Sequence, residues 1–313
     1  MITTPSRVNI VEVGPRDGLQ NEAATVSTAD KIRFIDMLTA AGCPVVEVGA
    51  FVSPKWVPQM ADTEAVYAGI QRKEGTRYPA LVPNAAGLDR AREAGVNEIA
   101  VFAASSETFS RRNINKSIDD SFEMYRGVVQ RATQLGMRVR AYLSTAFGCP
   151  YEGAVPTARV AELSSRLLEM GASEVAVSDT IGIAHPGQVR QVVDAVAQRL
   201  PLDRIALHFH DTRGTGLANV LAALDLGITT FDSSAGGLGG CPYAPGATGN
   251  LATEDLLFML NGLGIETGID LESVVAASDF MASRIGHAPA SRYFAAVHAS
   301  RASTPRDDRR SSN

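Results

Sequence analysis

Two histidines separated by one residue are the strongest chemical signal in this sequence. His208 and His210 stand at the end of the apolar run 204–209, and because side chains alternate along a strand, both imidazoles point to the same side. This arrangement favours a metal site; a pair of hydrogen-bonded core histidines is the alternative. Asp17 follows another apolar run and would add a carboxylate, and Asn250 would add an amide oxygen. Such nitrogen and oxygen donors suit a six-coordinate divalent ion, Mg²⁺ or Mn²⁺.

A glycine-rich segment, 234–250, has six glycines in 17 residues and contains Cys241. Glycine allows the backbone to approach a ligand closely. The segment lacks the Gly-Lys-Ser or Gly-Lys-Thr sequence of a phosphate-binding loop. We therefore expect a mobile lid that carries a thiol, with a generic flexible loop as the alternative. Cys43 and Cys149 are expected to be buried packing residues.

Acidic residues inside apolar runs form a further group of candidates. Glu12 and Glu47 lie in such runs, and a buried carboxylate without a partner is costly. They would either form a structural salt bridge, or cap a buried donor, or support Arg16 or a metal ligand. Further polar residues lie near or just after the carboxyl ends of the predicted strands: Arg16, Gln20, Tyr142, Ser144, Asp179 and Thr180.

Eight short apolar runs and the helical segments between them would position these residues. The pattern repeats as strand then helix, and segments 31–42, 160–171 and 217–227 have helical spacing. Eight such units predict an α/β fold, a closed (β/α)8 TIM barrel, which gathers chemistry at the carboxyl ends of its strands. An open doubly wound sheet is the alternative. The predicted strands are 8–13, 44–49, 79–83, 97–102, 137–145, 173–178, 204–209 and 228–233.

Length and charge limit the remaining choices. The chain has 313 residues, which fits one barrel, and segment 255–285 is predicted to be helical and to cover its side or bottom. We expect residues 1–298 to form the barrel domain with this C-terminal helical extension. Residues 299–313, with four Arg, two Asp and no apolar residue larger than Ala, are expected to be a disordered tail.

The composition also excludes some partners. A net charge of −5 argues against a nucleic-acid binder. The sequence has no run of 18 apolar residues, so we expect no membrane span. Three cysteines, an odd count without metal-type spacing, indicate a reducing compartment. The first residues resemble neither a secretory signal nor a transit peptide. We therefore expect a cytoplasmic protein.

With VEVGPRDGLQNE (11–22), HFHDTRG (208–214) and GGLGGCPYAPGATGNLATEDL (236–256) among its segments, the chain resembles the 3-hydroxy-3-methylglutaryl-CoA lyases of the barrel metallolyase superfamily. RDGLQ and HFHDT are shared with wider relatives, including isopropylmalate-type synthases and biotin carboxyltransferase domains, whereas the cysteine-bearing GGLGGCPYA points to the lyases. The matching segments are VEVGPRDGLQNE (11–22), FVSPKWVPQM (51–60), NINKSIDDSF (113–122), GCPYEG (148–153), SDTIG (178–182), HFHDTRG (208–214) and GGLGGCPYAPGATGNLATEDL (236–256).

The resemblance implies a retro-Claisen-type cleavage of hydroxymethylglutaryl-CoA to acetyl-CoA and acetoacetate, a step of leucine degradation and ketone-body formation. It implies that Asp17, His208, His210 and Asn250 hold the Mg²⁺ or Mn²⁺. Arg16 would stabilise the charge on the thioester oxygen, and Cys241 would protonate the acetyl enolate or gate that step. Either Asp17 or His208 would be the base.

The same resemblance assigns supporting roles. Glu12, Glu47 and Asp179 would orient the catalytic groups, and Gln20, Tyr142, Ser144 and Thr180 would bind the substrate. Arg111, Arg112 and Lys116 would contact the CoA phosphates, although a solvated basic patch would look the same. The expected partners are the acyl-CoA substrate and a second copy of the chain in a homodimer.

Three other functions fit the same residues. One is a lyase for a related 3-hydroxy-acyl-CoA, such as citramalyl-CoA. Another is a condensing acyltransferase of the isopropylmalate synthase type, which the cysteine loop disfavours. Outside enzymes, a degenerate barrel that only binds a ligand is the alternative. Loss of a metal ligand would favour that last reading, yet all four candidate ligands are present.

Overall fold

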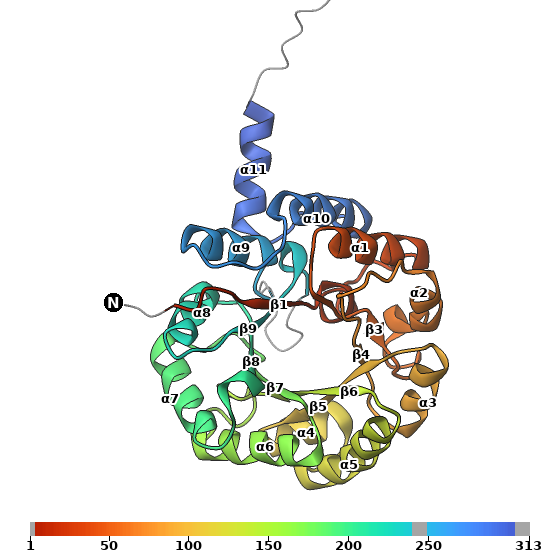
Figure 1. Ribbon diagram of the computed structural model, residues 1–313, viewed down its shortest axis with the longest axis vertical. Coiled ribbons are helices and arrows are strands. Elements are labelled where there is room, and N and C mark those ends of the chain that lie inside the picture. Colours follow the sequence, from red (N-terminus) through yellow and green to blue (C-terminus); the bar gives the residue numbers. More distant parts are fainter. Residues whose placement is uncertain (1–3, 240–248, 304–313) are drawn as a thin grey trace, which may run out of the picture.

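The structure, a computed structural model, describes residues 4–239 and 249–303 and consists of a ring of parallel strands surrounded by helices (Figure 1). In the described residues the sheet order is β2-β1-β9-β8-β7-β6-β5-β4-β3. The strands are β1 (Asn9–Glu12), β2 (Val45–Val46), β3 (Gly49–Ala50), β4 (Ala80–Leu81), β5 (Glu98–Ala104), β6 (Arg138–Ser144), β7 (Glu174–Asp179), β8 (Ile205–Phe209) and β9 (Thr230–Ser233).

The sheet closes on itself through the segment that contains β2 and β3. β2 pairs with β1, and β3 pairs with β4. Between them, the amide of Glu47 donates to the carbonyl of Glu12 at 2.9 Å, and the amide of Val48 donates to the carbonyl of Pro79 at 2.9 Å. β2 and β3 are therefore two halves of one barrel strand. The predicted eight-stranded barrel is confirmed, and the open sheet is excluded.

Helices cover the outside of the ring because each buries one apolar face against the strands. In α6, Val160, Leu163 and Leu167 are buried, and the helix ends at Gly171, whose φ of 118° suits glycine. The helices are α1 (Thr28–Ala40), α2 (Thr63–Gly69), α3 (Ala85–Glu93), α4 (Glu107–Ile114), α5 (Ile118–Gln134), α6 (Thr157–Met170), α7 (Pro186–Ala197), α8 (Gly216–Leu224), α9 (Thr253–Gly262), α10 (Leu271–Ile285) and α11 (Arg292–Ser303). Shorter turns are η1 (Gly14–Gly18), η2 (Pro58–Met60), η3 (Leu202–Arg204) and η4 (Ala235–Gly237).

The barrel interior contains small and large side chains in complementary places. Ala100, Ala176 and Ala206, from three strands, pack against Tyr142 in one buried cluster. These small residues leave room for Tyr142 and Arg140, both of which are buried. On β8, Leu207 and Phe209 belong instead to the core between sheet and helices. This alternation turns His208 toward the axis, as the sequence predicted.

The C-terminal region after the barrel is helical, as predicted. Segment 255–285 contains two helices, α9 and α10, separated where Gly264 and Gly268 both adopt positive φ. α10 lies beside α1 at the side of the barrel (Figure 1). The described helices include none with both the length and the apolar character needed to cross a bilayer.

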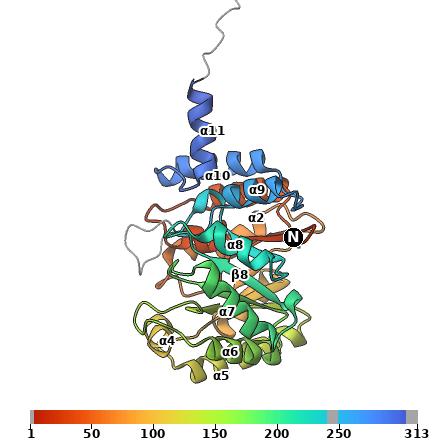
Figure 2. The same cartoon turned by 90° about the vertical axis from the view of Figure 1, so that its left-hand side faces the viewer.

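α11 continues to Ser303, so the expectation that disorder begins at residue 299 is wrong for 299–303. The helix projects from the body (Figure 2). The carboxylate of Asp255 caps its first turn by accepting hydrogen bonds from the Arg292 and Tyr293 amides. This anchor lies before residue 299, and the alanines that follow favour a helix even without large apolar side chains. Residues 304–313 lie outside the described residues.

Candidate metal centre and substrate cavity

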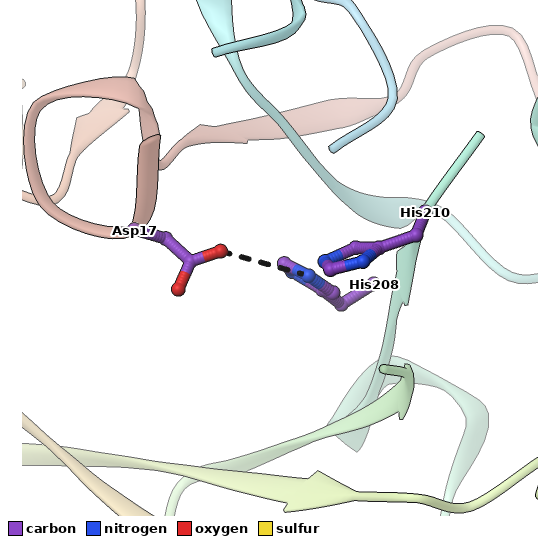
Figure 3. A group of neighbouring side chains, drawn as sticks. All are labelled: Asp17, His208 and His210. Atoms are coloured by element: carbon purple, nitrogen blue, oxygen red, sulfur yellow. Dashed lines mark ion pairs between the residues drawn. The ribbon is translucent and has the colours of Figure 1, made fainter. Parts of the chain in front are cut away.

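Asp17, His208 and His210 converge at the carboxyl ends of the strands (Figure 3). One potential ligand atom of each residue lies within 4.8 Å of those of the other two. Asp17 Oδ2 is 4.0 Å from His208 Nε2. Three of the four predicted ligands are thus brought together by elements that are far apart in the sequence.

A tight turn after β1 positions Asp17. In η1, a π-type turn with the sequence GPRDG, the Val13 carbonyl accepts hydrogen bonds from the amides of Arg16, Asp17 and Gly18 at 3.1, 2.8 and 3.1 Å. Turns of this type are frequent at functional sites. The turn ends the strand abruptly and directs Arg16 and Asp17 into the mouth of the barrel, where both line the same cavity.

The fourth predicted ligand, Asn250, reaches the same place from the segment after β9. It forms an isolated bridge with His210, and its Nδ2 donates to Asp17 Oδ2 and to the Leu238 carbonyl, both at 3.0 Å. Asn250 therefore contacts the cluster through its amide nitrogen, and its role as a ligand stays a prediction.

Two buried polar atoms of this cluster have no hydrogen-bond partner within the described residues. They are Nδ1 of His210 and Oδ1 of Asn250. Leaving a buried acceptor unsatisfied costs about 1–3 kcal/mol, so such atoms call for an explanation. Two imidazoles, a carboxylate and an amide oxygen are a donor set that divalent cations accept. The residues present therefore fit a divalent metal ion.

The charges of the cluster also suit a cation. Burial alone would raise the pKa of Asp17, but Arg16 and the two imidazoles lower it to about 2. Burial, together with the neighbouring His208, lowers the pKa of His210 to about 3. Burial would lower the pKa of His208 as well, but the hydrogen bond and charge of Asp232 raise it. At neutral pH Asp17 is anionic and His210 is neutral, which are the forms that bind metals.

Arg16 is held rigidly at the edge of the cluster. Its Nε donates to Glu47 Oε2 at 2.7 Å, and its Nη1 donates to Asp17 Oδ1 at 2.6 Å. The guanidinium carbon lies 5.2 Å from the centre of the Tyr142 ring, and the Tyr142 hydroxyl also donates to Glu47 at 3.1 Å. Glu47 is thus both a salt-bridge partner and a support for Arg16.

The other two predicted supporting carboxylates hold loops rather than Arg16. Glu12 accepts hydrogen bonds from the Gly14 and Ala235 amides at 2.8 and 2.9 Å and from the Thr253 hydroxyl at 2.6 Å. It therefore ties η1 to the segment after β9. Asp179 accepts from the amides of Ile183 and Ala184, both at 3.0 Å, and so shapes the loop after β7.

A cavity of about 310 Å³ lies beside the cluster of candidate metal ligands. All four predicted substrate-binding residues line it: Gln20, Tyr142, Ser144 and Thr180. Arg16, Asp17 and both histidines are also part of its wall. Residues that the sequence analysis did not identify complete it: Asn21, Phe102, Phe109, Asn113 and Ser178. The two phenylalanines carry no sequence signal that separates them from core residues.

A strained residue joins two parts of the cavity wall. Thr145 follows β6 with a φ of 58°, which is rare for a β-branched residue and costly. Its amide donates to Thr180 Oγ1 at 2.8 Å, and its hydroxyl donates to the Ser144 carbonyl at 2.6 Å. The strained turn thereby sets the relative positions of Ser144 and Thr180.

The predicted CoA contacts lie near the cavity but do not line it. Arg111 and Arg112 are exposed on α4, the helix that supplies Phe109 and Asn113 to the cavity wall. The Arg111 guanidinium is 3.8 Å from the Glu107 carboxylate, and Arg112 stacks over Tyr151. Lys116 follows α4. Contact with CoA stays a prediction for all three.

One important residue was missed. Asp232 on β9 accepts a hydrogen bond from His208 Nδ1 at 3.1 Å and is buried. It is the only carboxylate in the apolar run 228–233, so the criterion that selected Glu12 and Glu47 would also have found it. The predicted catalytic thiol, Cys241, lies outside the described residues. Cys43 and Cys149 are buried, as predicted.

A closed α/β barrel with two imidazoles, a carboxylate and a buried arginine at its carboxyl end defines a barrel enzyme with a candidate metal centre. Residues 7–281 match the family model described as HMGL-like. The chain belongs to this family and is a lyase.

Several proteins named as lyases are similar to this chain over nearly their full length. The mitochondrial hydroxymethylglutaryl-CoA lyase of Mus musculus is 52% identical over 292 residues, 93% of this chain and 90% of that protein. The 3-hydroxy-3-isohexenylglutaryl-CoA/hydroxy-methylglutaryl-CoA lyase of Pseudomonas aeruginosa is 53% identical over 288 residues, which are 92% of this chain and 96% of that protein. The crystal structure of the Pseudomonas aeruginosa hydroxymethylglutaryl-CoA lyase matches with a TM-score of 0.94 and 52% identity, covering 95% of this chain and 99% of that one. An A. baumannii HMG-CoA lyase in complex with coenzyme A and 3-methylmalate matches with a TM-score of 0.88 and 37% identity, covering 98% of each chain.

Proposed function

We propose that this enzyme cleaves 3-hydroxy-3-methylglutaryl-CoA to acetyl-CoA and acetoacetate and depends on a divalent cation, Mg²⁺ or Mn²⁺. The observation that carries the proposal is the convergence of Asp17, His208 and His210 beside Arg16 on one cavity. The relatives named as hydroxymethylglutaryl-CoA lyases, at about half identity over most of the chain, support the substrate.

In this reaction the tertiary alcohol loses its proton, the bond between C2 and C3 breaks, and C3 becomes the ketone of acetoacetate. The bonding electrons pass to the thioester fragment as an enolate, which takes up a proton to give acetyl-CoA. A bound divalent cation supplies Lewis acidity that lowers the pKa of an alcohol. Asp17, His208, His210 and Asn250 would hold it. Of the two candidate bases we propose Asp17, because a His208 that gives Nε2 to the cation and donates its Nδ1 proton to Asp232 has no free nitrogen to accept a proton.

Arg16 would stabilise the enolate oxygen. Its guanidinium is fixed before substrate arrives by Glu47 on one side and Asp17 on the other, at 2.7 and 2.6 Å. A donor that is already oriented needs no reorganisation when charge develops, and such donors contribute strongly to catalysis. Glu47 would orient Arg16, while Glu12 and Asp179 would hold the loops that carry the site.

Cys241 would protonate the enolate or gate that step. Its segment begins after β9, and the two described ends of that segment lie at the site. Leu238 and Asn250 are joined by a hydrogen bond, and Asn250 also contacts Asp17. For the CoA phosphates we propose Arg111, Arg112 and Lys116 on and after α4.

A lyase for another 3-hydroxy-acyl-CoA is the second candidate, and two observations favour it. The Pseudomonas aeruginosa relative is named for an isohexenyl substrate as well as the methyl one. In this chain Phe102 and Phe109 form the apolar part of the cavity wall, where a substituent on C3 would be accommodated. Citramalyl-CoA would use the same polar residues.

Purified protein with Mg²⁺ and a panel of 3-hydroxy-acyl-CoA thioesters would test this function, with acetyl-CoA release as the readout. We expect the highest kcat/KM with 3-hydroxy-3-methylglutaryl-CoA and no activity after chelation. A kcat/KM tenfold higher with another thioester would assign the enzyme to that substrate. Formation of the condensed product from acetyl-CoA and a keto acid would support the acyltransferase instead. We also propose a homodimer, which sedimentation velocity would test, and a cytoplasmic location.

A further inference from the structure

A buried ion network in the barrel interior ends at one of the candidate metal ligands. Asp232 on β9 is 2% exposed and is paired in register with His208 on the neighbouring β8. Its Oδ2 lies 3.1 Å from His208 Nδ1. An ionised carboxylate can only accept hydrogen bonds, so this contact requires the proton of the neutral imidazole to be on Nδ1. The lone pair is then on Nε2, the nitrogen that faces Asp17 at 4.0 Å.

Arg140 fixes the carboxylate that makes this contact. Its Nη2 donates to Asp232 Oδ1 at 2.6 Å, and its Nη1 donates to Asp232 Oδ2 at 3.1 Å. Its Nε donates to Glu174 Oε1 at 2.7 Å, and its Nη1 also donates to the Tyr142 hydroxyl at 2.9 Å. This two-point contact sets the plane of the Asp232 carboxylate and keeps it ionised, because a buried carboxylate is stable when paired with a cation.

The two histidines are held in different ways. Nδ1 of His210 has no hydrogen-bond partner within the described residues, whereas Nδ1 of His208 is held by Asp232. Neither Asp232 nor Arg140 lines the cavity, so neither is placed to touch substrate. Their contact with the site passes through the His208 ring and the Tyr142 hydroxyl.

We propose that Asp232, oriented by Arg140, is a positioning residue that keeps the proton of His208 on Nδ1 and so presents Nε2 to the metal ion. The inference rests on the proposed metal-dependent function and deepens it. Partners of this kind fix the tautomer and the ring orientation of a metal-binding histidine, and losing one typically weakens metal affinity by about 10–100-fold.

Asp232→Asn is the informative substitution because it preserves shape. Arg140 donates to both carboxylate oxygens, and its shorter contact is at Oδ1. In the variant, the amide oxygen would take the position of Oδ1 and accept from Arg140, and the NH₂ group would take the position of Oδ2 and face His208 Nδ1. His208 Nδ1 would then accept a hydrogen bond from this NH₂ group, so the imidazole would carry its proton on Nε2, and that proton would prevent Nε2 from binding the metal ion. We expect the Mn²⁺ dissociation constant, measured by calorimetry or EPR, to rise about 10–100-fold.

Glu174→Gln is the matched control. Glu174 is also buried and also pairs with Arg140, at 2.7 Å, but it does not contact His208. We expect this variant to share any loss of melting temperature and to bind Mn²⁺ within about twofold of the wild-type affinity. Equal Mn²⁺ affinity in wild type and Asp232→Asn would overturn the inference while leaving the metal site intact. Wild-type protein that binds no Mn²⁺ would overturn both the metal site and the inference.

A second measurement needs no variant, so it decides the question even if Asp232→Asn does not fold. In metal-free wild-type protein labelled with ¹⁵N-histidine, two-bond ¹H–¹⁵N spectra above the pKa of His208 report which nitrogen carries the proton. We expect the proton of His208 on Nδ1. A proton on Nε2 would overturn the inference.

Discussion

Arg16 donates to Glu47 at the position where the second barrel strand is interrupted. Glu47 lies between β2 and β3, and its backbone amide completes the pairing with β1 through the Glu12 carbonyl. Its side chain at the same time accepts from Arg16 Nε at 2.7 Å. The residue that joins the two halves of the strand thus also orients the proposed enolate-stabilising cation.

This contact predicts how two substitutions differ. Arg16→Met should lower kcat by about 10²–10³ with a smaller change in KM, because a fixed donor acts mainly in the transition state. Glu47→Gln should lower kcat by about tenfold, since Arg16 is present but less well oriented. Steady-state kinetics would measure both. Arg166→Met, which removes a surface pair with Asp119, is the control and should leave kcat unchanged. An increase in KM alone for Arg16→Met would mean that Arg16 only binds substrate.

Chelation should abolish turnover, and Mg²⁺ or Mn²⁺ should restore it. His210→Ala removes one imidazole from the cluster, and we expect it to weaken Mn²⁺ binding at least tenfold, as measured by calorimetry. His287→Ala is a suitable control because His287 is exposed and pairs with Glu22 instead. Full activity of wild-type protein in buffer treated to remove metals would refute the metal-dependent mechanism.

The stability of the metal-free protein should fall as the pH rises from about 4.5 to 7. Burial raises the pKa of Glu12 and of Glu254 to about 7, above the usual value of 4.5 for an exposed glutamate. The folded state therefore binds more protons than the unfolded state in this window, and stability decreases with pH. His208, whose pKa is also raised, acts in the same direction as its proton is lost. His210, whose pKa is lowered from 6.5 to about 3, acts in the opposite direction below pH 6.5, but it is one group against Glu12, Glu254 and His208.

Urea unfolding at several pH values, with chelator present, would measure this slope. Saturating Mn²⁺ should reduce or reverse it, because metal ions bind deprotonated ligands and stabilise the folded state. A free energy of unfolding that rises steadily from pH 4.5 to 7 in the metal-free protein would contradict the expectation.

The beginning of α11, not its end, should matter for stability. Asp255→Ala removes the carboxylate that accepts from the Arg292 and Tyr293 amides and from the Ser291 hydroxyl, and should cost about 1–2 kcal/mol. Truncation after residue 298 should change the melting temperature little, since Ala299 and Ser300 are exposed. Thermal unfolding would compare the two. A loss of several degrees on truncation would show that the end of α11 packs against another surface.

Cys241→Ser should preserve the fold and Mn²⁺ binding but remove most turnover, because a hydroxyl is a much weaker acid than a thiol. Alkylation should inactivate the enzyme, and a non-cleavable substrate analogue should slow the inactivation. Cys43→Ser and Cys149→Ser are controls, and neither should change the rate of inactivation because both thiols are buried. Wild-type turnover by Cys241→Ser would leave the loop as a lid without a catalytic thiol.

Properties that depend on neighbouring residues were predictable from the sequence alone. The eight apolar runs mark the barrel strands because a buried parallel strand needs several consecutive apolar residues. The spacing of His208 and His210 places both imidazoles on one face because strand side chains alternate. The position of Asp17 directly after a strand places it at the catalytic face, since parallel strands end at the same side.

Contacts between distant strands were decided only by closure of the barrel. The partner of His208 is 24 residues away, and Arg140 reaches Asp232 across 92 residues. No local pattern records such a pairing, because it depends on which inward side chains share a layer and on the small residues that leave them room. For the same reason, no local pattern in the sequence indicates that Phe109 lines the cavity. α11 is held at its beginning by a capping carboxylate from α9 and by the buried Phe294, both of which act before residue 299.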